Sequence, residues 1–233
     1  MFKRPHHQRI ARVLQALDGP LLHKHSCWFG GGTCIALRYG EYRESVDIDF
    51  IVSDVQGYRA LRELLTGPLG LAAITKAGAI PLQPLREIRA DQYGIRTMVQ
   101  MDGLPIKLEI VLEGRIALDT PSAADAILGI STLTPRDMAA TKLLANSDRH
   151  ADDGVFSRDA IDLAMMQLKL PALRAALAKA QQAYGPSVAR DLAKAINNLQ
   201  QRHGWLERCM QAMAIDMPKA LLWQKIRALL RVT

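Results

Sequence analysis

Two aspartates separated by one residue are the first feature of the sequence that suggests chemistry. Asp47 and Asp49 alternate with the apolar residues Val46, Ile48 and Phe50. Side chains two residues apart on a β-strand point to the same face, so both carboxylates should lie side by side. Mg²⁺ relieves the repulsion of such a pair when substrate phosphate oxygens complete its coordination shell. Exposed acids on an edge strand are the alternative interpretation of this motif taken alone.

A glycine-rich motif precedes the aspartates by about fourteen residues. Glycines such as Gly31 and Gly32 let backbone N–H groups approach a phosphate closely, and the Thr33 hydroxyl can donate another hydrogen bond. Arg43 and Ser45, just before the aspartates, can add phosphate contacts. A tight turn with Thr33 as helix N-cap is the alternative.

A further carboxylate falls on a later predicted strand. Residues 105–110 alternate apolar and charged side chains, and Glu109 could lie opposite Asp49. A solvent-facing strand position is the alternative for Glu109. Glu113 is a less favoured substitute, and Asp102 falls in a predicted turn.

The later part of the chain offers further charged candidates. Residues 134–137 resemble a capping box that opens a helix, so Asp137 has a structural explanation. Lys142 projects from beside an apolar stripe of that helix and could hold a triphosphate. Asp159 and Asp162 are one helical turn apart on the same face.

The same two aspartates also have a structural interpretation. Ser157 could cap their helix, where acids in the first turn suit the helix dipole. Arg158 precedes the first of them.

These residues must be positioned by an α+β fold, with an α/β core and mixed sheet followed by an all-helical half. We predict a core domain at residues 1–120 and a helical domain at 121–233, with prolines at several helix starts. The predicted helices and strands of the core are helices 5–18, 33–39 and 54–66 and strands 26–29, 46–52, 84–90, 95–101 and 105–113.

The charge is unevenly distributed. The net charge is +7, and residues 171–233 contain ten Lys/Arg but three Asp/Glu. A basic segment from residue 171 onward suggests an anionic partner such as nucleic acid, or simply a solubilising surface. No apolar run reaches transmembrane length, the N-terminus is too polar for a signal peptide, and three cysteines form no disulfide framework. We therefore expect a cytoplasmic protein. The N-terminal histidines, including His7, are expected at the surface without a role.

The order GGT, RxSxDIDF, KLE, DxxAxKLxA and RDxxDL resembles the AbiEii/AbiGii toxin family, which includes MenT-like toxins. That family belongs to the DNA polymerase beta-like nucleotidyltransferases, whose signature is GG[S/T] followed by DxD. The resemblance implies a metal pair at Asp47 and Asp49 and a third metal-binding carboxylate from a neighbouring strand, for which Glu109 is the candidate. It also implies an essential lysine and acid at Lys142 and Asp159. The lysine usual before that acid is replaced here by Arg158, and Glu109 is the loosest correspondence.

The resemblance also implies the reaction and its partners. It implies NMP transfer from an NTP with release of pyrophosphate, with Mg²⁺ as cofactor and Mn²⁺ as an alternative. Glu109 or Asp159 would orient or deprotonate the acceptor hydroxyl. A tRNA 3′ end is the leading acceptor, and a cognate antitoxin is the expected partner in a toxin-antitoxin or phage-defence system. A protein or small-molecule acceptor, or a non-catalytic nucleotide- or RNA-binding module, is the alternative.

Overall fold

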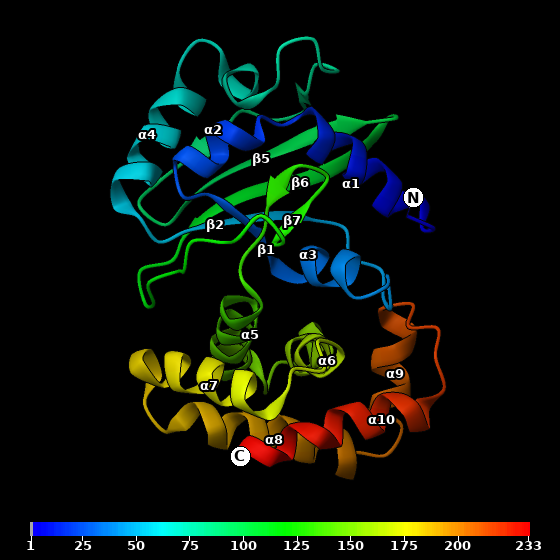
Figure 1. Cartoon of the computed structure of the whole chain (residues 1–233). Coiled ribbons are helices and arrows are strands. Elements are labelled where there is room, and N and C mark those ends of the chain that lie inside the picture. Colours follow the sequence, from blue (N-terminus) through cyan, green and yellow to red (C-terminus); the bar gives the residue numbers. More distant parts are fainter. Residues whose placement is uncertain (1) are drawn as a thin grey trace. The chain divides into compact units, whose positions relative to one another are not determined.

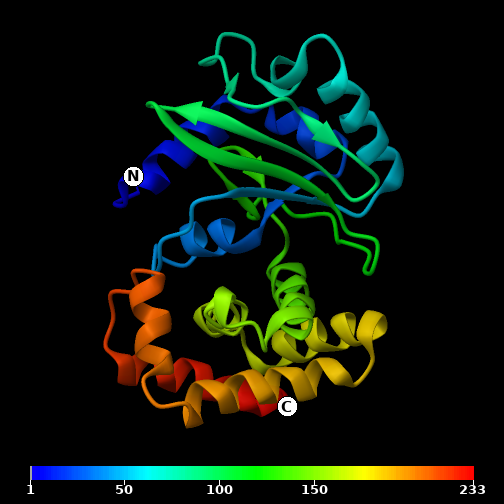
Figure 2. The ribbon, with the colours of Figure 1, turned by 180° about the vertical axis from the view of Figure 1, so that it is seen from behind.

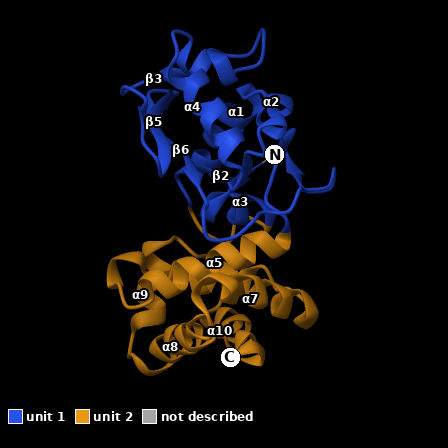
Figure 3. Cartoon of the chain, turned by 90° about the vertical axis from the view of Figure 1, so that its left-hand side faces the viewer, with its two compact units in different colours: residues 1–38, 45–134 blue, residues 39–44, 135–233 orange. Residues whose placement is uncertain are grey.

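The computed structural model describes residues 2–233, which form two compact units (Figure 3). Unit 1 contains residues up to Arg38 and Ser45–Thr134, and unit 2 contains Tyr39–Glu44 and Pro135–Thr233. The main division therefore falls fourteen residues after the predicted boundary at residue 120. A six-residue segment of unit 2 also interrupts the sequence of unit 1.

Unit 1 contains the main sheet and the helices that accompany it (Figures 1 and 2). Its helices are α1 (Pro5–Ala16), α2 (Gly19–Lys24), α3 (Gly31–Arg38) and α4 (Val55–Thr66), with a short 3₁₀ turn η1 (Gly70–Ile74). Its strands are β1 (Trp28–Gly30), β2 (Ile48–Val52), β3 (Gln83–Pro84), β4 (Arg89–Ala90), β5 (Gly94–Met101), β6 (Leu104–Leu112), β7 (Ala126–Ile127) and β8 (Ile130–Ser131).

The main sheet is mixed, with strand order β1-β2-β6-β5-β3 and β4 paired to β5. β2 and β6 run parallel, whereas β1 pairs with β2 and β5 pairs with β6 in antiparallel fashion. The register aligns Gly30, Asp49, Glu109 and Arg96 in one row across four strands. Directly paired residues share a face of a sheet, so this row places two carboxylates and a guanidinium on the same surface.

The alternate residues of these strands form the core of unit 1. Ile48, Phe50, Ile106, Leu108 and Ile110 are each at most 1% exposed. Helices α1 and α4 contact the sheet, and both are amphipathic, with apolar residues at helical spacing. Along β2 and β6, buried side chains therefore alternate with side chains on the opposite, polar face of the sheet.

Unit 2 is helical in all of its regular elements from residue 135 onward. These elements are α5 (Pro135–Arg149), η2 (Asp153–Val155), α6 (Arg158–Met165), α7 (Leu170–Tyr184), α8 (Ser187–Gln201), α9 (Trp205–Ala212), α10 (Lys219–Arg227) and η3 (Ala228–Val232). Helix α5 contacts α6, α7 and α8, so it is the central element of this unit.

The α+β class and the helical C-terminal half are confirmed. The predicted strand 84–90 is wrong, because only its two ends pair with β5, as β3 and β4. Strand structure also continues past residue 121 in the short β7–β8 hairpin, which the sequence pattern did not predict. The predicted proline starts agree with the structure at Pro135, the first residue of α5.

Candidate active site

Asp49 lies directly against the backbone of Gly31. β1 ends at Gly30, which pairs with Asp49, and α3 begins at the next residue with no intervening loop. Gly31 has a φ of +68°, and a methyl group there would lie 2.8 Å from the Asp49 Cβ and closer still to its carboxylate. Glycine is therefore required both by its backbone conformation and by the space that the carboxylate occupies.

Glu109 is the direct neighbour of Asp49 on the parallel strand β6. On its other side it accepts a hydrogen bond of 2.6 Å from Arg96 Nε, and Lys107 Nζ donates to it at 2.5 Å. Burial alone would raise the Glu109 pKa, but the hydrogen bonds from Lys107 and Arg96 outweigh it, and the pKa is lowered. The register prediction for Glu109 is thus fulfilled, with the carboxylate already neutralised by two cations.

Lys107 connects the third carboxylate electrostatically to the aspartate pair. Burial alone would lower the pKa of the Lys107 ammonium, but the hydrogen bond and charge of Glu109 outweigh burial, and the pKa is raised. The negative charges of Asp47 and Asp49 act in the same direction. Asp47 precedes β2 by one residue and, like Asp49, is partly exposed.

The other carboxylates considered for this position lie elsewhere. Glu113 follows β6 and holds Arg115 through several hydrogen bonds, among them one of 2.7 Å. Asp102 is in the β5–β6 turn and pairs with Arg12 at 2.5 Å. Among residues 2–233, no group of three His, Cys, Asp or Glu side chains is close enough to hold a metal ion by itself.

Thr33 and Ser45 are joined by a hydrogen bond in unit 1. Thr33 is in the first turn of α3, inside the helix rather than at an N-cap, and its hydroxyl donates to Ser45 Oγ at 2.8 Å. The Ser45 N–H donates to His7 Nε2 at 3.2 Å, and His7 is fully buried. The expectation that His7 lies at the surface without a role was therefore wrong. Its buried ring accepts a hydrogen bond from the backbone two residues before Asp47.

Unit 2 holds a buried ion cluster around Lys142. Lys142 is 7% exposed, and its Nζ lies 2.9 Å from Asp159 Oδ1 and 2.7 Å from Asp162 Oδ2. Burial would lower the Lys142 pKa, but the charges of the two aspartates raise it above its usual value. Burial acts oppositely on the aspartates, and the surrounding cations hold both of their pKa values below the ordinary range.

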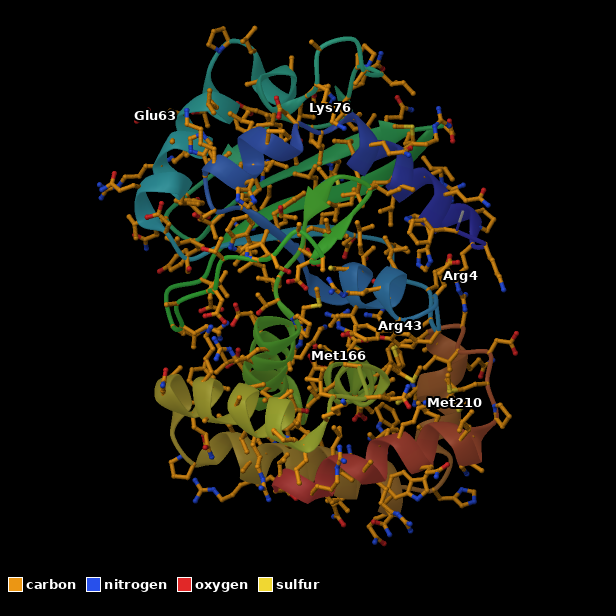
Figure 4. The ribbon with its side chains drawn as sticks, viewed as in Figure 1. Arg4, Arg43, Glu63, Lys76, Met166 and Met210 are labelled. Carbon is orange, nitrogen blue, oxygen red and sulfur yellow. The ribbon has the colours of Figure 1, made fainter. Side chains whose placement is uncertain are left out.

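The segment Tyr39–Glu44 completes this cluster from a distant part of the sequence. Arg43, labelled in Figure 4, donates from Nε and Nη2 to the two oxygens of Asp162 at 2.6 and 2.9 Å. Tyr42 adds a hydrogen bond to the same carboxylate at 2.5 Å. Arg43 is 5% exposed, so a contact with phosphate would require it to leave a buried bidentate pair.

Asp159 is held by a cation that the sequence reasoning missed. Arg149 donates to both of its oxygens at 2.7 and 2.9 Å, while the neighbouring Arg158 is exposed. Arg149 lies seven residues after Lys142, two turns further along α5, and this spacing was the available signal. The cluster therefore contains three cations and two carboxylates.

The turn before α6 differs from the predicted cap. Phe156 and Ser157 both have positive φ, at +52° and +50°, and Ser157 makes no side-chain cap bond. Its hydroxyl instead accepts a hydrogen bond from Trp205 Nε1 at 3.0 Å. Asp137 lies outside the Lys142 cluster and bonds to Lys179.

Three polar atoms at the C-terminal end of α5 and just after it are buried without a hydrogen-bond partner among the described residues: Asn146 Nδ2, Ser147 Oγ and His150 Nδ1. Asn146 and Ser147 are on the same helix as Lys142, and His150 is the first residue after it. An unpaired buried donor costs about 1–3 kcal/mol, so such atoms indicate a missing polar partner. The sequence pattern gave no sign of them.

A family model named "Nucleotidyl transferase AbiEii toxin, Type IV TA system" matches residues 12–232. The chain belongs to the AbiEii family. The match spans both units, so the carboxylate row and the Lys142 cluster are both parts of an AbiEii chain. No curated protein matches the chain significantly.

Two solved structures share the AbiEii chain's fold. JHP933 from Helicobacter pylori is 16% identical, with a TM-score of 0.55, and the match covers 99% of this chain and 92% of that one. A candidate nucleotidyltransferase from H. pylori is also 16% identical, with a TM-score of 0.54 and coverage of 97% and 92%. At this identity the likeness establishes the fold. No helix within residues 2–233 is long and apolar enough to span a membrane.

Proposed function

We propose that this chain is a metal-dependent nucleotidyltransferase that moves NMP from an NTP to a tRNA 3′ hydroxyl. The observation that carries the proposal is the carboxylate row beside α3, in which Asp49 contacts Gly31 and pairs in register with Glu109. Membership of a nucleotidyltransferase toxin family supports it.

Asp47 and Asp49 would hold Mg²⁺, or Mn²⁺ in its place. Their hard carboxylate oxygens suit either ion, and Gly31 keeps space for the Asp49 carboxylate. When bound, the ion would neutralise phosphate charge and polarise the α-phosphoryl group. Because no group of three metal-binding side chains is found in residues 2–233, NTP oxygens and water are needed to complete the shell.

The first turn of α3 would bind the phosphates. Helix N-termini present N–H groups and a partial positive charge to anions. Gly31 and Gly32 allow close approach, and the hydrogen-bonded hydroxyls of Thr33 and Ser45 are within the same unit. Lys107, near both aspartates, would balance their charge before the nucleotide enters.

In the transfer step, the acceptor oxygen attacks the α-phosphorus, a new P–O bond forms, and the bond to the β-phosphate oxygen breaks. Pyrophosphate leaves with the electron pair of that bond. Glu109 is bonded to Arg96 and Lys107. Asp159 is bonded to Lys142 and Arg149. Either carboxylate would have to leave its ion pairs to accept the hydroxyl proton. We infer that the hydroxyl proton passes to solvent, and that Glu109 orients Lys107.

The Lys142 cluster would act by positioning. Lys142 is already bonded to two carboxylates, so holding a triphosphate would break a buried ion network. Arg43 anchors the chain two residues before Ser45 and four before Asp47. The cluster therefore fixes the segment that leads directly into the metal-binding motif.

The test incubates purified protein with total tRNA, Mg²⁺ and each α-³²P-labelled NTP separately. We expect label in the tRNA band with at least one NTP, reduced about 10²–10³-fold by Asp49→Asn, the size seen when one charge-stabilising group is removed. Glu63→Gln, an exposed acid on α4 (Figure 4), is the matched control and should keep full activity.

Absence of label from folded protein with every NTP would overturn the tRNA acceptor. The same reactions with protein lysate or small hydroxyl compounds then identify another acceptor. Induced expression in cells tests the toxin role, since growth arrest should require Asp49. A neighbouring gene that relieves the arrest would be the antitoxin.

A further inference from the structure

Unit 2 contains a pocket on the opposite end of α6 from Asp159. It has a volume of about 410 Å³ and lies between the α6–α7 connection and α10–η3. Small-molecule sites have volumes of roughly 300–1,000 Å³, so this pocket can admit a phosphodiester and its sugars. Its polar lining includes Gln167, Lys169, Gln224, Lys225 and Arg231.

The pocket combines three cations with no acidic side chain in its lining. Both walls come from stretches that lack Asp and Glu altogether, residues 163–190 and 217–233. Lys169, Lys225 and Arg231 repel one another around this space, and the walls supply no counter-charge. A bound anion would remove that repulsion.

Two of the lining residues are held in position by the backbone. Arg231 donates from Nε to the Ala228 carbonyl at 2.7 Å and from Nη2 to the Leu168 carbonyl at 3.2 Å. A guanidinium has five N–H donors, so others remain to bind an anion. Gln167 has a φ of +46°, an uncommon conformation for a non-glycine residue that turns the chain toward Lys169.

We propose that this pocket binds a backbone phosphate of the acceptor RNA, a site that rests on the proposed function. The lining contains no aromatic side chain on which a base could stack, which favours a phosphate over a whole nucleotide. The pocket is lined by residues of 164–169 and 221–231. Residues 171–233 contain ten Lys/Arg and three Asp/Glu, so the positive charge of this region exceeds what one phosphate would neutralise. Binding to a polyanion such as RNA uses such an excess of positive charge.

The test measures fluorescence anisotropy of labelled tRNA with the full chain, without NTP or divalent metal, over a series of salt concentrations. Lys225→Gln combined with Arg231→Gln should weaken binding about 10-fold and reduce the slope of log K against log salt by roughly 1–2. The matched control is Arg174→Gln with Arg190→Gln, exposed residues of α7 and α8 outside the pocket lining. This control removes the same charge and should change binding less than 3-fold. Circular dichroism verifies that both double variants are folded.

Equal weakening by both double variants would overturn the proposal, because it would show diffuse attraction alone. Inorganic phosphate and NTP are tested separately by thermal shift. If either stabilises the wild type but not the pocket variant while tRNA binding is unaffected, the pocket is a small-phosphate site and the proposal is wrong.

The design also separates this proposal from the proposed function. Binding is measured without chemistry, and Asp49→Asn should bind tRNA as the wild type does. If tRNA binds through the pocket but is never labelled, the transfer reaction fails and the pocket stands. Labelling of tRNA that is unchanged in both rate and KM by the pocket variant would overturn the pocket alone.

Discussion

Asp49 and Asp162 are both aspartates in short charged motifs, yet the two units hold them in opposite ways. Asp49 is partly exposed on a sheet face that also carries Glu109, and Asp47 lies just before the strand. Asp162 is fully buried, with Arg43 and Lys142 on its oxygens. The two aspartates therefore differ in solvent access, because Asp49 is partly exposed whereas Asp162 is enclosed by Arg43 and Lys142. This difference favours the proposed chemistry at Asp49 and a positioning role for Asp162.

The largest change in stability is expected when the buried carboxylate charge of Asp162 is removed. Asp162→Asn should lower the free energy of unfolding by about 3–5 kcal/mol, because Arg43 and Lys142 remain buried without a full counter-charge. Urea unfolding followed by tryptophan fluorescence measures it, since Trp205 and Trp223 are both in unit 2.

Asp153→Asn is the matched control for that change. Asp153 also makes a bidentate pair, with Arg202 at 2.6 and 2.7 Å, but both side chains are exposed. Its loss should be far smaller, because water screens an exposed pair. Equal effects of the two substitutions would contradict the contrast between the sites.

The second-largest loss of stability is expected at low pH, where the aspartates of the Lys142 cluster become protonated. The folded pKa values of Asp159 and Asp162 lie below the ordinary aspartate value of 3.8. Their contribution to stability is therefore complete above that value and is lost as the pH falls below about 4 toward the lowered values. Urea titrations from pH 6 to pH 3 should show this loss. A double Asp159→Asn, Asp162→Asn variant that kept the full pH dependence would assign it to other groups.

Gly31→Ala should cost about 1–3 kcal/mol, because a residue with a side chain is strained at positive φ and its methyl would overlap the Asp49 carboxylate. Gly114→Ala is the control, since a methyl group there has open space, and its effect should stay within about 0.5 kcal/mol. Displacement of Asp49 should also remove transfer activity. A Gly31→Ala enzyme with normal stability and activity would show that this contact is not required.

Asn146→Leu should change the free energy of unfolding by less than about 1 kcal/mol, because the amide nitrogen it removes has no partner. Urea unfolding of the wild type and the variant measures this change. A loss of several kcal/mol would mean that the amide nitrogen has a polar partner.

Asp49→Asn should have the smallest effect on stability, within about 0.5 kcal/mol, although it should reduce transfer about 10²–10³-fold. Removing one charge from a partly exposed acidic face relieves repulsion. Mn²⁺ binding, followed by its electron paramagnetic resonance signal, should be weak in wild type alone and strengthen with NTP. The variant should lose that strengthening, and tight Mn²⁺ binding without nucleotide would contradict the two-carboxylate site.

The sequence predicted best what is local or periodic. Alternation placed Asp49 and Glu109 on strands, and helical spacing placed Asp159 beside Asp162. It could not predict that Arg43 pairs with Asp162, because that contact joins residues 119 positions apart. Nor could it predict the breakup of strand 84–90, where pairing to β5 rather than residue preference decides the structure. His7 was misjudged for the same reason, since its burial depends on tertiary packing.

The excursion of Tyr39–Glu44 into unit 2 has a consequence for biosynthesis. A ribosome delivers Arg43 long before Asp162, and at about 5–20 residues per second the 119 peptide bonds from Arg43 to Asp162 take roughly 6–24 s. During that interval the nascent chain carries the Arg43 guanidinium without its carboxylate partner, next to the motif that contains Asp47 and Asp49. The buried cluster of unit 2 therefore cannot form until the residues of α5 and α6 have been synthesised. A fragment that begins at Pro135 would lack Tyr42 and Arg43, which contribute to this cluster. The order of synthesis thus delays anchoring of the segment that carries Asp47 and Asp49 until Asp162 has been made.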